Sequence, residues 1–293
     1  MLRGRRAAVA AAFAAVAAAV VAAGCGGGST SSALSLDPVA AAATKSQSAG
    51  AARVRLSIAV SGPQGKTFRM RGTGAIDGAS SDLRFRLGSL LGPAGMPSGA
   101  ISQLARGSLR AITLEEDGDY VVYVRLGSLL SSRLPGGQQW LKLDLSKMGK
   151  SAGVDLSKLL SGGQLQPGDL LSLLATEGAK IHKVGSDTVN GAATAHYRVV
   201  VDTRARLKEL GSPLLAAVAA RMPKVPADVW IGNDGLVRRV RVSFDLPHGG
   251  APVHTALAMD LYDYGAHIDI AAPPSNQVFD ATELAQQGLG SLH

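Results

Sequence analysis

The stretch at residues 53–60 decides the fold, and it reads Arg53-Val54-Arg55-Leu56-Ser57-Ile58-Ala59-Val60. Aliphatic side chains alternate here with arginine and small residues, and a period of two places the two sets on opposite faces of a β-strand. Residues 68–71 repeat this pattern in a strand that runs on to an Asp77-Gly78 turn, and residues 82–87 repeat it after the turn. The sequence therefore predicts three successive antiparallel strands at this point of the chain.

The same alternation recurs along most of the remaining chain. Further strands are expected at 109–116, 120–126, 140–144, 180–184, 196–201, 229–231, 236–244 and 255–264. Turn signals at Asp117-Gly118 and Asn190-Gly191 join two pairs of them. Short helices are expected at 39–47 and 282–287, with two leucine-rich helical insertions at 156–174 and 203–222. Because strands and helices do not alternate, we predict an α+β fold with a single long, curved antiparallel sheet. The alternation along the strands indicates that one face of this sheet is wet and the other is covered.

The composition limits the classes of protein that the chain can be. A formal net charge of +8 includes three N-terminal arginines, so the rest of the charge is spread thinly and does not indicate a nucleic-acid partner. A single cysteine, Cys25, leaves no possibility of an internal disulfide, so the domain depends on its own core.

The N-terminus has the pattern of an export signal. Three arginines precede the apolar run 7–23, which is rich in alanine and shorter than a membrane span requires. The predicted organisation is a signal peptide at 1–24, a flexible tether at 25–36, one domain at 37–285 and a tail at 286–293. Val21-Ala22-Ala23-Gly24-Cys25 resembles a bacterial lipoprotein signal. This resemblance implies a diacylglyceryl group and a further acyl chain such as palmitate on Cys25, and an anchor on the extracytoplasmic face of the cell membrane.

Sequence motifs for catalysis and metal binding are missing. No serine lies in a G-x-S-x-G elbow, the Gly149-Lys150-Ser151 triplet lacks the first glycine of a phosphate loop, and the six histidines do not have the spacing of metal ligands. We therefore expect a protein that is not an enzyme and that carries no cofactor other than the covalent lipid.

Arginines occupy the polar phase of the predicted strands. On an antiparallel sheet they would gather on the exposed face, either as an ordinary solubilising surface or as a surface that attracts anionic headgroups or envelope polymers. The set is Arg53, Arg55, Arg69, Arg71, Arg84, Arg86, Arg239 and Arg241.

The leucine-rich insertions are too apolar to face water, so they are expected to pack on the sheet. They either fill the core or stand off a curved sheet and line a cavity for a small molecule. The candidate cavity residues are Leu156, Leu159, Leu160, Leu170, Leu171, Leu174, Leu207, Leu210, Leu214 and Leu215.

Several short motifs, in a consistent order, resemble the LppX/LprAFG family of actinobacterial lipoproteins. They are Val225-Pro226-Ala227-Asp228-Val229-Trp230-Ile231 with the following acidic Gly turn, Val189-Asn190-Gly191 leading to His196-Tyr197-Arg198, Gln139-Trp140-Leu141-Lys142-Leu143-Asp144, and Ile268-Asp269-Ile270-Ala271-Ala272-Pro273-Pro274. The resemblance implies a fold similar to the LolA/LolB lipoprotein carriers, which is a curved antiparallel half-barrel with helices covering its concave face. It also implies a cavity for acylated lipids or glycolipids.

Two functions are compatible with these observations. The first is a membrane-anchored envelope lipoprotein that binds a lipid or lipoglycan in an apolar cavity and assists its transport across the envelope, together with an envelope transporter as partner. The alternative is a structural or sensory envelope lipoprotein, also not catalytic, whose basic sheet face binds anionic polymers or a protein partner.

Overall fold

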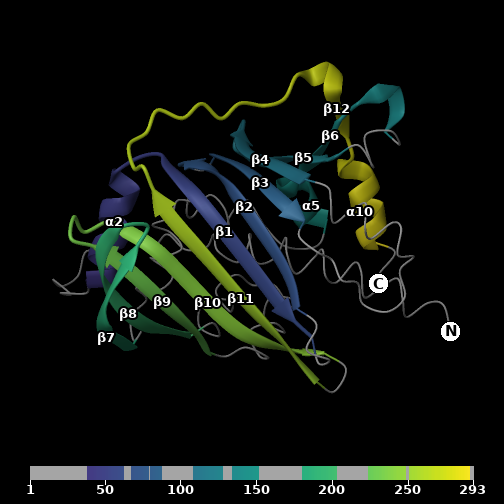
Figure 1. The fold of residues 1–293 in the computed structure, drawn as a ribbon. Coiled ribbons are helices and arrows are strands. Elements are labelled where there is room, and N and C mark those ends of the chain that lie inside the picture. The colour runs from purple at the N-terminus through teal and green to yellow at the C-terminus, as the bar shows by residue number, and fades with distance from the viewer. Residues whose placement is uncertain are drawn as a thin grey trace.

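A computed structural model of the chain describes residues 38–62, 67–78, 80–87, 108–127, 134–151, 180–202, 224–248 and 251–290 (Figure 1). The predicted signal peptide, the tether and both leucine-rich insertions lie outside these ranges. Within them, the helices are too short or too polar to cross a membrane.

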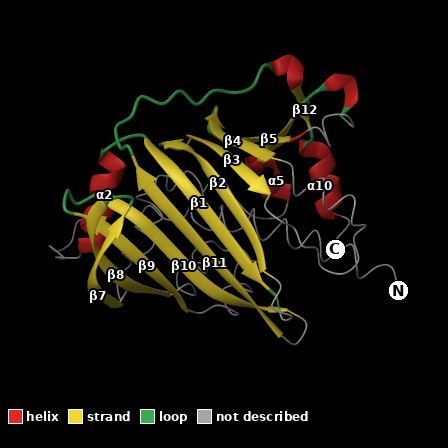
Figure 2. Ribbon diagram, viewed as in Figure 1, coloured by secondary structure: helices red, strands yellow, loops and turns green. Residues whose placement is uncertain are grey.

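One open, curved sheet holds all twelve strands of the described residues, in the order β12-β6-β5-β4-β3-β2-β1-β11-β10-β9-β8-β7 (Figure 2). Neighbouring strands are antiparallel except β12 and β6, which are parallel. The prediction of a single curved, essentially antiparallel sheet is thus confirmed. The strands are β1 (Ala52–Ser61), β2 (Thr67–Asp77), β3 (Ser80–Leu87), β4 (Ser108–Glu116), β5 (Asp119–Leu126), β6 (Trp140–Asp144), β7 (Lys180–Val189), β8 (Ala192–Asp202), β9 (Lys224–Gly232), β10 (Val237–His248), β11 (Ala251–Tyr262) and β12 (Val278–Asp280).

Two of the predicted turns have the backbone that a two-residue hairpin needs. Asp117 and Gly118 have φ angles of 53° and 81°, and Asn190 and Gly191 have φ angles of 49° and 83°. Asparagine, aspartate and glycine tolerate this left-handed region best, which explains their place in tight hairpins. Both turns connect the strand pairs predicted from the sequence, β4 with β5 and β7 with β8.

The main hydrophobic core lies on the face formed by the apolar phase of the strands. Val54 and Ile58 of β1 meet Leu261 and Leu257 of β11 in register, and Met70 of β2 pairs with Ile58. We call this side the apolar face. Its fully buried members are Val54, Ile58, Met70, Val199, Ala227, Val229, Val237, Val240, Met259 and Leu261.

Helix α2 (Pro38–Ser48) packs on the apolar face at β9 and β10. Ser46 accepts a hydrogen bond from the Val237 amide at 2.9 Å, and the Tyr264 hydroxyl donates to the Val237 carbonyl at 2.7 Å. Burial raises the pKa of Tyr264 to about 12, so the phenol remains a donor at neutral pH. These contacts hold one end of the apolar face closed under a helix that the alanine-rich sequence predicted.

Helices α5 (Leu145–Ser151) and α10 (Thr282–Gly290) lie at the opposite end of the sheet, near β5 and β6 (Figure 1). The helix predicted near 282–287 is confirmed, and residue 286, where a tail was predicted to begin, lies inside α10. The helices that were predicted to cover the concave face fall on the leucine-rich insertions, outside the described residues.

A second, smaller core lies on the other side of the sheet. Ile112, Tyr123 and Trp140 are buried together with Val121, and Ile270 and Val278 pack against them. These residues lie on the same face of the sheet as the arginines, as the contacts of Arg110 and Arg125 with the Trp140 ring show. The expectation that one face of the sheet is entirely wet is therefore wrong at β4–β6, where the chain after β11 returns and covers it.

Gly74 permits the close approach of β2 and β3. A Cβ at this position would lie 2.0 Å from the Asp82 carbonyl oxygen, so any larger residue forces the two strands apart.

We expect Gly74→Ala to lower the free energy of unfolding by about 2 kcal/mol, measured by urea denaturation. Gly185→Ala is the control, because a Cβ there meets no atom within 4 Å and its φ lies outside the left-handed region. Equal effects of the two substitutions would refute the steric explanation.

Candidate functional site

Strand register places all eight predicted arginines on one side of the sheet. Arg55 pairs with Asp260, and Asp260 pairs with Arg239 on the next strand. Ser57 pairs with Arg71, which pairs in turn with Arg86. The expectation that the arginines gather on one face is confirmed, and we call this side the arginine face.

A buried carboxylate lies at the centre of this face. Asp260, taken as a whole residue, has a relative exposure of only 6%. Its carboxylate accepts two hydrogen bonds from Arg239, at 2.5 and 2.7 Å. Arg55 lies 3.8 Å from the same carboxylate and donates to the Asn190 side chain at 3.0 Å, while the Asn190 amide donates to Asp260 at 3.4 Å. The hydrogen bonds to Asp260 raise the pKa of the Arg239 guanidinium despite its partial burial. This cluster joins β1, β10, β11 and the β7–β8 turn.

A hollow of about 610 Å³ opens beside the carboxylate cluster. Its floor is a block of four small side chains: Ser57 opposite Ala258, and Ala59 opposite Ala256. Small residues at four adjoining positions leave space that the flanking arginines enclose. Arg55, Arg239 and Arg241 line the hollow, together with Asp187, Asn190, Trp230 and Asp260.

Trp230 forms one wall of the hollow and is held from both sides. The His196 ring stacks on it with centroids 4.3 Å apart and planes 6° apart, and the Arg239 guanidinium lies 5.8 Å from its centre. The Trp230 indole N–H donates to Asp187 at 3.3 Å. The His196 ring is itself hydrogen-bonded to Asp228 of β9 at 2.8 Å. The wall is therefore a fixed part of the protein, and its aromatic ring is already occupied by neighbours.

The donors around the hollow suit the binding of anions. Guanidinium groups stay charged at all physiological pH values and offer several N–H donors. Among the described residues there is no group of three His, Cys, Asp or Glu side chains that could hold a metal ion. The hollow thus presents three guanidinium groups, beside two carboxylates that already accept hydrogen bonds from Trp230 and Arg239.

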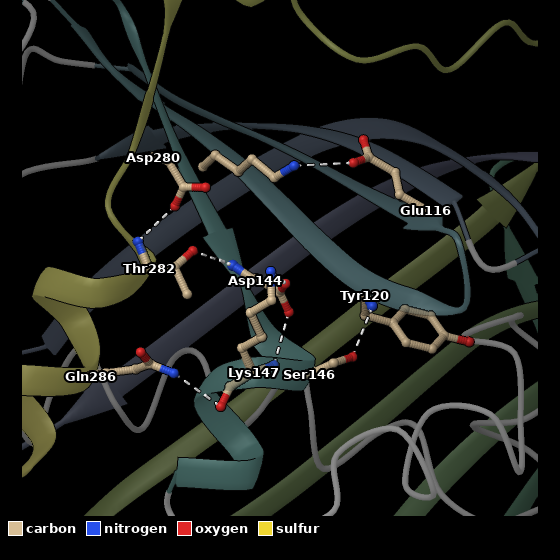
Figure 3. Close-up of polar contacts among 9 residues, drawn as sticks. Glu116, Tyr120, Asp144, Ser146, Lys147, Asp280, Thr282 and Gln286 are labelled. Carbon is tan, nitrogen blue, oxygen red and sulfur yellow. Dashed lines mark hydrogen bonds and ion pairs between the residues drawn. The ribbon is translucent and has the colours of Figure 1, made fainter.

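A second polar cluster, shown in Figure 3, anchors the C-terminal helix. Thr282 accepts a hydrogen bond from the Asp144 amide at 3.0 Å and donates its own amide to Asp280 at 2.9 Å. Burial opposes ionisation of Asp280, but the hydrogen bonds from Thr282 and the positive charges of Lys142 and Lys147 together outweigh it and lower its pKa. Ser146 accepts from the Tyr120 amide at 3.0 Å. The remaining contacts are Lys147–Asp144 at 2.9 Å, Lys142–Glu116 at 3.3 Å and Gln286 to the Lys147 carbonyl at 3.2 Å. The cluster ties α5 and α10 to the sheet edge, which is a structural role.

The predicted lipidation site and the predicted cavity residues lie outside the described part of the chain. They are Cys25 and the ten candidate cavity leucines between Leu156 and Leu215. Conversely, the sequence did not single out Asp260, Asn190 or Trp230 as members of one site. The available signal was Asp260 itself. It is an acidic residue at a position of β11 that points to the arginine face, so it must meet arginines of the neighbouring strands.

Comparisons with known proteins find one similar sequence and several similar solved structures. No family model matches it. An uncharacterized 31.2 kDa protein from the rplA–rplJ intergenic region of Streptomyces griseus is 26% identical over 270 residues, which cover 86% of this chain and 81% of that protein. Among solved structures, LprF from Mycobacterium bovis has a TM-score of 0.42 and 11% identity, covering 81% of this chain and 96% of LprF. The lipoprotein LppX from Mycobacterium tuberculosis has a TM-score of 0.42 and 15% identity, covering 80% of this chain and all of LppX.

The chain is similar to LprF and LppX. Members of the family that its motifs resemble are thus found among the similar solved structures.

Proposed function

We propose that the chain is a membrane-anchored lipoprotein of the cell envelope that binds a lipid or lipoglycan on the apolar face of its sheet and assists its transport. The observation that carries the proposal is the uneven burial of that face. At the end of the strands near α2 the apolar side chains are fully buried. At the other end they are only partly buried, so this end offers apolar surface to a ligand.

Burial on the apolar face decreases along the strands. Near α2, Val54, Leu261 and Val237 are at most 1% exposed. At the other end of the same strands, Val60 and Phe68 face each other across β1 and β2 and are only partly buried. Val242 and Leu257 are paired in the same way on β10 and β11. We call these four residues the open apolar end. Partly exposed apolar side chains in one patch favour contact with an apolar ligand.

The described helices do not supply a cover for the middle of this face. Helix α2 contacts β9 and β10, and α5 contacts β5 and β6. Ser151 ends α5 near one edge of the sheet, whereas Lys180 begins β7 at the other edge. We propose that the candidate leucines of the two insertions, at 156–174 and 207–215, face the apolar side of the sheet and line the lipid cavity with the open apolar end.

The anchor and the partners belong to the same proposal. A diacylglyceryl group on Cys25 would hold the domain on the extracytoplasmic face of the cell membrane, through the Gly- and Ser-rich tether that follows. A lipid carrier in that place needs no catalytic group, and an envelope transporter would be the partner that exchanges lipid with it. Shape and apolar contact would then determine which lipid binds.

The open apolar end provides the test. We expect Phe68→Gln to weaken binding of a fluorescent long-chain fatty acid by about tenfold, because the contact of a buried phenylalanine contributes about 1.5–3 kcal/mol. Fluorescence titration of the full chain measures the dissociation constant. Arg69→Gln is the matched control, since the neighbouring residue points to the opposite face, and we expect it to change the constant less than twofold.

Two results would contradict the proposal. One is a wild-type protein that does not bind the fatty acid at all. The other is an equal loss of affinity in Phe68→Gln and Arg69→Gln, since that would place the binding surface elsewhere or show a general loss of structure. Circular dichroism of both variants checks that the sheet is intact.

A further inference from the structure

Arginines stand on both sides of the floor of the hollow: Arg241 lines the hollow itself, and Arg71 lies on the strand beyond Ser57. In register across the sheet, Arg241 pairs with Ala258, Ala258 with Ser57, and Ser57 with Arg71. Neighbouring strands lie about 4.8 Å apart, so the Cα atoms of Arg241 and Arg71 are separated by about 14 Å. Two long side chains can therefore approach one group that rests on the small residues between them.

The arginines near the hollow fall into two sets. Arg239 donates two hydrogen bonds to Asp260 and Arg55 donates one to Asn190, so both guanidinium groups are held by neighbouring side chains. Arg241 and Arg71, by contrast, have no ion-pair partner among the described residues. The acid nearest to Arg241 in register is Asp228, and it is held by His196 and Arg198 at 2.8 and 3.1 Å. The second set is therefore available to an external anion.

We propose that this hollow binds a phosphate group of an extended anionic polymer. A phosphate offers oxygens in several directions, so it can accept hydrogen bonds from arginines on both sides of the floor, whereas a carboxylate offers two oxygens in one plane. The row of arginines continues beyond Arg71 to Arg86 on β3, which provides a second contact for the next phosphate along a chain. A hollow with a floor and walls fits a narrow chain that lies across the strands better than it fits a flat bilayer surface.

This site is independent of lipid binding. Ser57 and Ala258 point away from the apolar face, on which Val54, Ile58 and Leu261 are buried. A protein that fails to bind fatty acid can therefore still bind phosphate polymers, and the reverse also holds. The two proposals are tested with different ligands and different variants.

The test uses linear inorganic polyphosphate of defined length, labelled at one end, and fluorescence anisotropy with the full chain. We expect Arg241→Gln and Arg71→Gln each to weaken binding by about tenfold, because a hydrogen-bonded charged contact is typically worth that much or more. Ala258→Leu keeps the net charge but fills the hollow, and we expect a similar loss. Arg125→Gln, on β5 and outside the hollow, removes the same charge and should change affinity less than twofold.

Two further probes distinguish the sources of phosphate. We expect inorganic phosphate alone to compete only weakly, and vesicles of phosphatidylglycerol to bind without dependence on Ala258. Equal losses in Arg241→Gln and Arg125→Gln, with wild-type affinity in Ala258→Leu, would overturn the proposal, because the attraction would then be diffuse. Vesicle binding that Ala258→Leu abolishes, with no binding of polyphosphate, would also overturn it and identify the surface as a membrane contact.

Discussion

Asp260→Ala is expected to lower the free energy of unfolding by about 3 kcal/mol, because removing one partner of a buried ion pair leaves the other charge without compensation. The Asp260 side chain is 9% exposed and accepts both hydrogen bonds of Arg239, while Arg55 and Asn190 approach the same carboxylate. The alanine therefore affects three strands and the β7–β8 turn together. Urea denaturation followed by circular dichroism measures the change.

Asp263→Asn is the control for this effect. Asp263 follows β11 by one residue and lies 3.6 Å from Arg53, but both side chains are more than half exposed. Its φ angle of 50° lies in the left-handed region, which asparagine tolerates as aspartate does, so the substitution removes the charge alone. An exposed pair of this kind contributes less than about 1 kcal/mol, so we expect little change. If Asp260→Ala were as stable as Asp263→Asn, the carboxylate cluster would not hold the arginine face together.

Cys25→Ala is expected to move the protein from the membrane fraction to the soluble fraction. The predicted lipid on Cys25 supplies several acyl chains, and each buried methylene contributes about 0.8 kcal/mol of membrane affinity, so their removal abolishes stable anchoring. Fractionation of cells at low and high salt, with the mass of the N-terminal peptide, measures both the location and the modification. Ser29→Ala in the tether is the control and should stay with the membrane.

A Cys25→Ala protein that remains membrane-bound would contradict this mechanism. Retention that high salt reverses would identify the arginine face as the anchor, because screening weakens contacts between exposed charges. Retention that resists high salt would identify the apolar run at 7–23 as an uncleaved span. Either result would require another explanation for how the domain is held at the envelope.

Local patterns were sufficient to predict eleven of the twelve described strands and two hairpin turns, but not the short strand β12 or the second core. Alternation placed the arginines on one face, and Asn190-Gly191 determined a hairpin, because both depend on neighbouring residues only. Ile112 and Tyr123 share the arginine phase but are buried by Ile270, which follows them by more than a hundred residues. The alternation within β4 and β5 does not predict that a distant segment returns and covers these two residues.

The hollow could not be predicted from the sequence either, because it too depends on segments that are far apart in the chain. Ser57 and Ala59 look like ordinary small residues of a polar strand face, and so do Ala256 and Ala258. They form a floor only because the register of β1 against β11 places the two pairs side by side. A register shift of one residue would move each set to the other face. The same register brings Asp260 between Arg55 and Arg239, which makes it a buried partner of both.

Native mass spectrometry of the protein purified from its own membranes tests the central proposal most directly. We expect a species heavier than the lipid-modified chain by the mass of a noncovalently bound lipid, which collisional activation removes and which is much reduced in Phe68→Gln. A wild-type protein that carries only its covalent lipid, and that also fails to take up added lipid, would contradict the proposal that the apolar face is a lipid-binding surface.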